Sequence, residues 1–236
     1  MTAARERRSL GLTALATHGL MLAAEDGDLR RQVNSLDIVT PDGQPVRWAL
    51  NALWDAKLVD RVYGPDLTGH VCAAAASEGV AVYLFGSTPE TCHKMADHLR
   101  RRYPGLTFAG IQPDRFRDAT PEEDAADVEA INTSGAGVVL VGRGCPRQER
   151  WVADHLGRVN AAMLAVGAAF DYYAGTIRRP PAWMQRVGME WLHRLIQEPG
   201  RLWRRYVIYN TKFAVRFSAA LVRRRLLGRP GARSLP

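Results

Sequence analysis

Short apolar runs alternate with helix-length amphipathic stretches along most of the 236-residue chain. The apolar runs are typical of buried strands and occupy residues 36–40, 80–85, 107–111, 137–141 and 161–166. The amphipathic stretches are typical of helices and occupy residues 45–57, 67–77, 89–102, 121–133 and 147–156. This alternation predicts a doubly wound α/β domain built on a mainly parallel sheet.

Positive charge is concentrated in the last quarter of the chain. From Arg178 onward there are 14 Arg and Lys residues against 2 acidic ones, whereas the preceding residues carry 18 against 22. A net charge of +8 therefore combines a mildly acidic body with a strongly basic tail. The asymmetry predicts that the tail meets phospholipid, nucleic acid or a phosphorylated substrate. The alternative is a solvated basic tail without a partner.

The basic tail also has the pattern of an amphipathic helix with aromatic residues. One narrow stripe of such a helix is basic and contains Arg205, Lys212, Arg216 and Arg223. The adjoining stripe is apolar and contains Leu202, Tyr206, Phe213, Phe217 and Ala220. We therefore expect an α/β domain at 10–178, a membrane-associating appendage at 179–227 and a frayed tail at 228–236. The alternative is a helix that packs its apolar stripe on the body.

Several kinds of protein are disfavoured by what the sequence lacks. Cys72, Cys92 and Cys145 lie far apart without a CxxC pair, which argues against zinc and against a disulfide framework and favours a reducing compartment. We recognise no export signal and no run of about 18 apolar residues, so we expect no segment to span a bilayer. Neither GxGxxG nor GxxxxGKS/T occurs, so we expect neither a dinucleotide fingerprint nor a Walker loop.

Polar residues and glycines gather in four clusters, three of which follow predicted strands, where open α/β sheets place their ligands. The clusters are 40–44 (TPDGQ), 61–66 (RVYGPD), 142–151 (GRGCPRQERW) and 166–171 (VGAAFD). Each carboxylate alone fits a turn or a helix cap. Together they fit an inverting sugar transfer, in which a carboxylate takes the proton of the acceptor hydroxyl and cations stabilise the departing diphosphate. Asp66 provides the carboxylate, and the tail arginines provide the cations.

These motifs, in this order, resemble those of the WecG/TagA/CpsF glycosyltransferase family. The matching segments are 41–43 (PDG), 61–66, 142–151, 167–175 (GAAFDYYAG) and 179–199, which contains RxPxW and GxEWLxRLxxEP. The resemblance extends from about Leu15 to Tyr206. It implies a Rossmann-like α/β fold with a C-terminal appendage that associates with the membrane.

The resemblance also implies an activity. Members transfer N-acetylmannosamine or a related sugar, with inversion, from a UDP donor to a polyprenyl-diphosphate-linked acceptor in cell-surface polysaccharide synthesis, for example of exopolysaccharides. We accordingly expect no cofactor, no bound metal and no nucleic-acid partner. We expect a cytoplasmic protein that lies peripherally on the inner face of the cell membrane, in an oligomeric state that the sequence leaves open.

Individual site residues follow from the same resemblance. The family's base falls on Asp66, and the other positions matched to substrate contacts are Thr17, Asp42, Gln148, Glu149, Asp171, Arg194, Arg201 and Arg204. The arginines are matched to the donor's diphosphate. One motif departs from the family, because its Thr-x-Asn reads Thr17-His-Gly19 here. A missing amide removes a contact that could select the donor sugar, so the sequence does not identify that sugar.

Two other classes of protein compete with this interpretation. A nucleic-acid-binding α/β protein with a basic Arg/Trp-rich arm would bind DNA or RNA with a steep salt dependence, but it gives no reason for Gln148, Glu149 or Asp171. A nicotinamide-dependent oxidoreductase would share the βα alternation, but the glycine fingerprint of such enzymes is absent.

Overall fold

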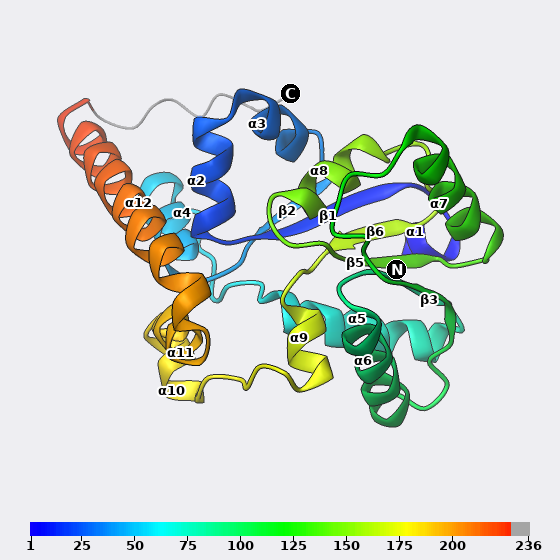
Figure 1. Cartoon of the computed structure of the whole chain (residues 1–236). Coiled ribbons are helices and arrows are strands. Elements are labelled where there is room, and N and C mark those ends of the chain that lie inside the picture. The colour runs from blue at the N-terminus through cyan, green and yellow to red at the C-terminus, as the bar shows by residue number, and fades with distance from the viewer. Residues whose placement is uncertain (228–236) are drawn as a thin grey trace. The chain divides into compact units, whose positions relative to one another are not determined.

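The computed structural model describes residues 1–227, and these form two compact units (Figure 1). Unit 1 comprises Met1–Ala14, Leu22–Thr40 and Val62–Arg179, and unit 2 comprises Leu15–Met21, Pro41–Arg61 and the chain from Pro180 onward. The predicted frayed tail, 228–236, lies outside the described residues. The predicted domains, 10–178 and 179–227, concern which parts fold autonomously and stay a prediction.

A six-stranded sheet forms the centre of unit 1, in the order β2-β1-β6-β5-β3-β4. The strands are β1 Leu10–Leu15, β2 Ile38–Pro41, β3 Val82–Gly86, β4 Phe108–Gln112, β5 Val138–Gly142 and β6 Ala162–Ala165. Strand β6 pairs in parallel with β1 and β5, and β3 pairs in parallel with β5 and β4. The predicted doubly wound, mainly parallel sheet is confirmed.

Helices cover both faces of this sheet (Figure 1). One face carries α1 (Thr2–Arg5), α5 (Gly64–Glu78), α6 (Pro89–Arg102) and α9 (Ala169–Ala174). The opposite face carries α7 (Pro121–Thr133) and α8 (Arg147–Asp154), and α3 (Gly27–Asn34) packs on α8. Successive side chains of a strand point to opposite faces, so β3 places Val82 and Leu84 on the first side and Tyr83 and Phe85 on the second.

Two helices begin and end as predicted, because their first residues carry strong capping signals. The Thr88 hydroxyl caps α6 by accepting a hydrogen bond from the Thr91 amide, and Pro89 supplies the favoured first residue. Helix α7 begins with a reciprocal capping box in which Thr120 and Glu123 each accept a hydrogen bond from the other's backbone amide.

Strand β1 was not predicted, because two of its residues interrupt the apolar pattern. Gly11 is needed for packing, since a Cβ there would lie 3.0 Å from side-chain atoms of Leu36 and Leu156. Thr13 is fully buried and donates its hydroxyl hydrogen to Oε1 of Glu149 at 3.2 Å. The pattern of β1 is therefore disturbed by one close approach and one buried hydrogen bond.

Other elements were missed or shifted. Helices α2 (Thr17–Glu25), α3 and α9 were not expected, and α5 begins three residues earlier than predicted, at Gly64. Helix α8 ends at Asp154, two residues earlier than predicted. The predicted helix 45–57 is α4 (Gln44–Trp54), which ends where Asp55 adopts a left-handed φ of 56°. The shift of α5 matters for function, because it places Asp66 inside the first helical turn.

Unit 2 consists of α4, the first turn of α2 and three C-terminal helices. These are α10 (Ala182–Arg186), α11 (Glu190–Gln197) and the 29-residue α12 (Pro199–Leu227), which contacts both α4 and α11. In the predicted apolar stripe of α12, Leu202 and Phe213 are buried, so this part of the stripe packs on protein. Between Met1 and Leu227 no helix is both long and apolar enough to cross a membrane.

Candidate active site

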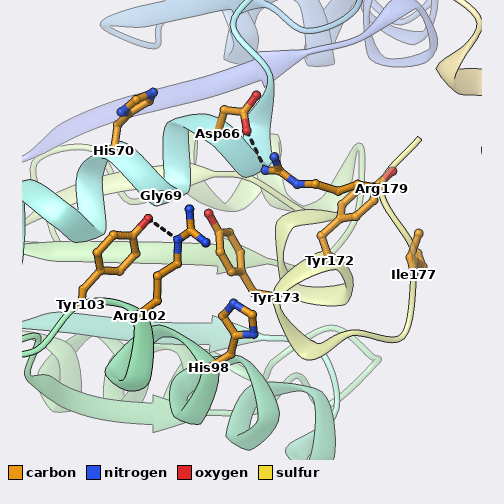
Figure 2. A pocket seen from close by; sticks show the side chains of 10 residues that line it. All are labelled: Asp66, Gly69, His70, His98, Arg102, Tyr103, Tyr172, Tyr173, Ile177 and Arg179. Atoms are coloured by element: carbon orange, nitrogen blue, oxygen red, sulfur yellow. Dashed lines mark hydrogen bonds and ion pairs between the residues drawn. The ribbon is translucent and has the colours of Figure 1, made fainter. Parts of the chain in front are cut away.

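A pocket of about 320 Å³ opens in unit 1 between α5, α6 and α9 (Figure 2). Its lining residues come from these helices and from the segment after α9, and they are Asp66, Gly69, His70, His98, Arg102, Tyr103, Tyr172, Tyr173, Ile177 and Arg179. Asp66 is the only acidic residue among them, whereas two arginines and two histidines are basic. The lining therefore suits a polar ligand that carries negative charge and hydroxyl groups.

Asp66 lies in the first turn of α5, which starts with Gly64 and Pro65. A carboxylate is favoured there by the exposed amides and the dipole of the helix. A Cβ on Gly64 would lie 3.5 Å from the carbonyl oxygen of Val166, just beyond β6, so this end of α5 lies at the carboxyl edge of the sheet. Asp66 therefore lies on the edge where parallel α/β sheets bind their ligands.

Arg179 forms an ion pair with Asp66 at the mouth of the pocket (Figure 2). Its guanidinium group donates a hydrogen bond to Oδ1 of Asp66 at 2.6 Å and lies over the Tyr63 ring at 5.8 Å. Both members of the pair are close to half exposed, at 45% for Asp66 and 47% for Arg179. Asp66 is thus held in a defined position and remains accessible to a substrate.

Two tyrosine hydroxyls converge above Gly69, one helical turn after Asp66. A Cβ on Gly69 would lie 2.5 Å from the Tyr173 hydroxyl oxygen and 3.0 Å from that of Tyr103. Tyr173 donates its hydroxyl hydrogen to the carbonyl oxygen of Pro65 at 2.9 Å, and burial raises the pKa of Tyr173. The absent side chain of Gly69 therefore lets both hydroxyls approach α5 closely.

The end of the pocket formed by α6 is basic. The Arg102 Nε–H donates a hydrogen bond to the Tyr103 hydroxyl oxygen at 3.0 Å, and no ion pair of the described residues includes Arg102. Partial burial lowers the pKa of His98, and the positive charges of Arg101 and Arg102 lower it further. His98 is consequently a neutral hydrogen-bonding group at neutral pH.

A second polar group of residues lies inside unit 1, between β1 and the start of α8. Oε1 of Glu149 accepts hydrogen bonds from the Thr13 hydroxyl at 3.2 Å and from the Gln148 amide at 2.9 Å. Burial raises the pKa of Glu149, and the hydrogen bonds from Gln148 and Thr13 offset part of this rise. Oε1 of Gln148 has no hydrogen-bond partner among the described residues, and Gly167 leaves the space that it fills. Gln148 and Glu149 thus belong to a buried network.

The order of the strands marks a further position at the carboxyl edge of the sheet. Strand β3 leads through α6 to β4 on one side, whereas β5 leads through α8 to β6 on the other side and across the opposite face. The ends of β3 and β5 therefore form a topological switch point, where open α/β sheets bind ligands. Gly86 and Gly142 end the two strands, and a Cβ on Gly86 would lie 2.6 Å from the Gly142 backbone.

A buried carboxylate with two arginines lies next to this switch point, and the sequence analysis did not single it out. Asp114 accepts hydrogen bonds from Arg143 at 3.1 Å and from Arg147 at 2.9 Å, and its side chain is almost fully buried. Arg143 also lies over the Phe85 ring at 5.5 Å. The basic residues of the motif 142–151 thus hold the loop after β4 against the ends of β3 and β5.

Unit 2 contains the remaining predicted site residues except Asp171. The Thr17 hydroxyl donates to Oδ1 of Asn210 on α12 at 3.3 Å, and the backbone amide of Asp42 donates to the Leu15 carbonyl at 3.1 Å. Next to Thr17, His18 packs against Tyr209, and burial together with the charge of Arg205 lowers its pKa to about 4.

The three predicted arginines of unit 2 interact with residues close to them in the chain. Arg194 and Arg201 both pair with Glu198, at 2.8 Å and 2.6 Å, and Arg204 lies over the Trp203 ring at 5.4 Å. Arg61, from the motif 61–66, is nearly buried and pairs with Glu190. This arginine therefore has a structural role, whereas Asp66 of the same motif faces a pocket.

The structure thus brings one predicted residue, Asp66, into a pocket whose other lining residues the sequence analysis did not select. Asp171 lies in the first turn of α9, directly before Tyr172 of the lining. The usable signal was the spacing of Asp66, Gly69 and His70, because residues three and four apart share one helical face. In residues 1–227 no group of three or more His, Cys, Asp or Glu side chains is arranged to hold a metal ion.

The fold and the site define a class: a Rossmann-like α/β protein with an accessible carboxylate at the mouth of a basic, phenol-lined pocket. The model of the glycosyl transferase WecG/TagA/CpsF family matches residues 1–227, and the chain belongs to this family. It is therefore a glycosyltransferase of cell-surface polysaccharide synthesis. Membership implies, in general terms, a nucleotide-sugar donor and a lipid-linked acceptor.

Proposed function

We propose that this glycosyltransferase moves N-acetylmannosamine or a related sugar from a UDP donor to a polyprenyl-diphosphate-linked acceptor, with inversion, at the inner face of the cell membrane. The observation that carries the proposal is the position of Asp66. In a chain of this family, this carboxylate lies on the ligand-binding edge of the sheet, where Arg179 holds it at the mouth of a pocket. A nucleic-acid-binding protein would have no use for a carboxylate in that position.

Asp66 acts as the general base of a single displacement. The acceptor hydroxyl oxygen forms a bond to the anomeric carbon while its proton passes to the Asp66 carboxylate. The bond between the anomeric carbon and the phosphate oxygen breaks, and its electron pair leaves with the nucleoside diphosphate. Attack from the face opposite the leaving group inverts the anomeric configuration, and Asp66 afterwards releases its proton to solvent.

The departing diphosphate carries negative charge that cations can stabilise. The candidates from the sequence are Arg194, Arg201 and Arg204, and their role stays a prediction. Arg194 and Arg201 both pair with Glu198, which brings their two guanidinium groups together. Guanidinium groups bind diphosphate oxygens through two parallel hydrogen bonds, which suits this role.

Donor recognition is assigned to the carboxyl edge of the sheet. Oε1 of Gln148 is a buried acceptor without a partner among the described residues, and such a group costs stability unless a ligand supplies a donor. An N–H group of the nucleotide base or of an acetamido sugar would supply one. Glu149 then acts by holding the Gln148 amide, and Thr17, Asp42 and Asp171 remain predicted contacts.

Membrane association is supported by the exposed side of α12. This side is largely apolar over several turns, and its exposed large residues are Trp203, Val207, Ile208, Val215, Val222 and Leu226. The exposed arginines Arg216 and Arg223 belong to the predicted basic stripe. Apolar side chains next to a basic stripe, with tryptophan at the boundary, suit the surface of an anionic bilayer.

The direct test is a transfer assay on the full chain. The protein is incubated with each of a panel of UDP-sugars and with a short-chain prenyl-diphosphate sugar, and products are identified by mass spectrometry. We expect one UDP-sugar to yield UDP and a lipid-linked disaccharide in equal amounts. Absence of transfer from every UDP-sugar, together with transfer from a different nucleotide sugar, would refute the assigned donor.

A further inference from the structure

The pocket below Asp66 extends well beyond what proton transfer needs. It runs from Asp66 along α5 to the C-terminal end of α6, where Arg102 and Tyr103 lie (Figure 2). A base needs only to reach one hydroxyl group, whereas this pocket of about 320 Å³ is large enough to enclose part of a substrate.

We propose that this pocket binds the acceptor, with its diphosphate at Arg102, its sugar ring beside Tyr103 and Tyr173, and its attacking hydroxyl at Asp66. The inference rests on the proposed function. It adds that the acceptor, and not the donor, occupies the pocket next to Asp66. The sequence motifs do not include Arg102 or Tyr103, and Tyr173 lies within the segment 167–175 without having been predicted as a site residue.

The spacing along α5 fits such a substrate. Gly69 lies three positions after Asp66, a rise of about 4.5 Å along a helix. The Tyr103 hydroxyl oxygen that would lie 3.0 Å from a Cβ on Gly69 also accepts the hydrogen bond from Arg102. Asp66 and the Arg102–Tyr103 pair thus lie in one pocket lining on either side of Gly69, so one bound substrate can contact both.

The chemistry of the lining also fits. Arg102 has no carboxylate partner among the described residues, so a phosphate oxygen would meet an available guanidinium group. Tyrosine presents a flat apolar face and a hydroxyl, and it can therefore contact both the C–H face and the hydroxyls of a sugar. Gly69 lets both tyrosine hydroxyls approach α5, where they line the pocket.

The position of the pocket separates it from the donor. Open α/β sheets bind nucleotides beyond the carboxyl ends of their strands, at a switch point such as that of β3 and β5. The pocket lies instead within the helical layer of α5, α6 and α9. Asp66 stands at the carboxyl edge, between these two places, where a base must lie to act on an acceptor that attacks a donor.

The test compares two variants that each remove one positive charge from the end of α6. Arg102→Gln alters the pocket, and Arg101→Gln is the matched control, because Arg101 is exposed and is not part of the lining. We expect Arg102→Gln to raise the acceptor KM about tenfold while the donor KM changes by less than about twofold. Arg101→Gln should leave both constants close to those of the wild type.

Gly69→Ala provides an independent test that leaves every charge in place. Its added methyl group must push the Tyr103 and Tyr173 hydroxyls apart, so we expect the acceptor KM to rise again. The thermal midpoint checks that the variant is folded. If it is not, Tyr103→Phe replaces it, because this variant removes only the hydroxyl that holds Arg102.

The outcomes separate this inference from the proposed function. If the wild type transfers sugar and Arg102→Gln behaves like Arg101→Gln, the pocket assignment is wrong and the proposed function stands. A rise in the donor KM alone would assign the pocket to the donor and overturn the inference. If the wild type transfers nothing, calorimetric titration with farnesyl-diphosphate-linked N-acetylhexosamine decides. Weaker binding to Arg102→Gln than to Arg101→Gln supports the pocket, and equal or absent binding refutes it.

Discussion

The two units differ in how many of their large apolar side chains are exposed. Of the 17 large apolar side chains that are exposed among residues 1–227, 13 belong to unit 2, although it is the smaller unit. In unit 1, β3 and β6 are buried along their whole length, and β5 is buried except at its last residue. A large interior is what holds a reactive group in place, whereas exposed apolar and basic residues are what a surface-binding segment needs. The comparison fits the proposal that unit 1 carries the chemistry and that unit 2 attaches to the membrane.

Asp66→Asn in unit 1 gives the largest expected effect. The amide keeps the shape of the side chain but cannot take a proton, so the transfer rate should fall by about 10²–10⁴-fold. Because Asp66 is close to half exposed, the thermal midpoint should stay near that of the wild type. Single-turnover rates and circular dichroism measure the two quantities. A variant with more than about a tenth of the wild-type rate would contradict the role of Asp66 as the base.

Glu149 tests whether a second carboxylate of unit 1 is structural rather than reactive. Glu149→Ala leaves the donors of Thr13 and Gln148 unpaired in the interior, so the free energy of unfolding should fall by about 3 kcal/mol. Denaturant titration at neutral pH measures this change. A stable Ala variant would show that the buried network contributes little to the fold.

The matched variant Glu149→Gln keeps the shape of the side chain and tests the direction in which stability changes with pH. Burial raises the pKa of Glu149 above its usual 4.5, so the stability that its protonated form contributes is complete below pH 4.5. That stability is lost as the pH rises through the higher pKa of the folded state. The Gln variant should therefore lose less stability than the wild type between pH 4.5 and neutrality.

Val215→Glu tests the attachment role of unit 2. Val215 is exposed on the apolar side of α12, and a carboxylate there should weaken binding to an anionic bilayer about tenfold. The control is Ala126→Glu, which adds the same charge on the exposed surface of α7 in unit 1. Co-sedimentation with vesicles of phosphatidylglycerol and phosphatidylcholine measures the bound fraction. Equal binding of both variants would refute a membrane role for this side of α12.

The smallest expected effect concerns His18, in unit 2. Its pKa is lowered from 6.5 to about 4 by burial and by the charge of Arg205, so the folded state prefers the neutral ring. The stability this contributes is complete above pH 6.5 and is lost as the pH falls toward 4. Because the ring is only partly buried, the loss should be about 1 kcal/mol. His18→Gln should remove this part of the pH dependence in denaturant titrations, and an unchanged pH dependence would refute it.

The regular part of unit 1 was predictable from the sequence. Short apolar runs such as Val138–Gly142, between helix-length amphipathic stretches, favour a buried strand, and Thr88 and Thr120 fix the starts of α6 and α7. Strand β1 was not predictable from its pattern, because Gly11 and Thr13 are required by contacts with residues far away in the chain. Thr13, for example, is paired with a residue 136 positions later.

The site was predictable only in part, for a similar reason. The motif that ends at Asp66 identified the carboxylate, but the pocket around it also uses Arg102 and Tyr173, which belong to helices that meet α5 only in the folded chain. Spacing within one helix could suggest Gly69 and His70. For α12, the pattern identified an apolar stripe that is partly packed, and the exposed apolar side became visible only with the burial of Leu202 and Phe213.

The anomeric configuration of the product tests most directly whether Asp66 acts as a base in a single displacement. Nuclear magnetic resonance of the lipid-linked product gives the configuration of the new bond, which is compared with that of the bond in the UDP-sugar. A base at position 66 predicts inversion and no covalent adduct. Retention of configuration, together with a glycosylated Asp66 trapped by mass spectrometry, would contradict it.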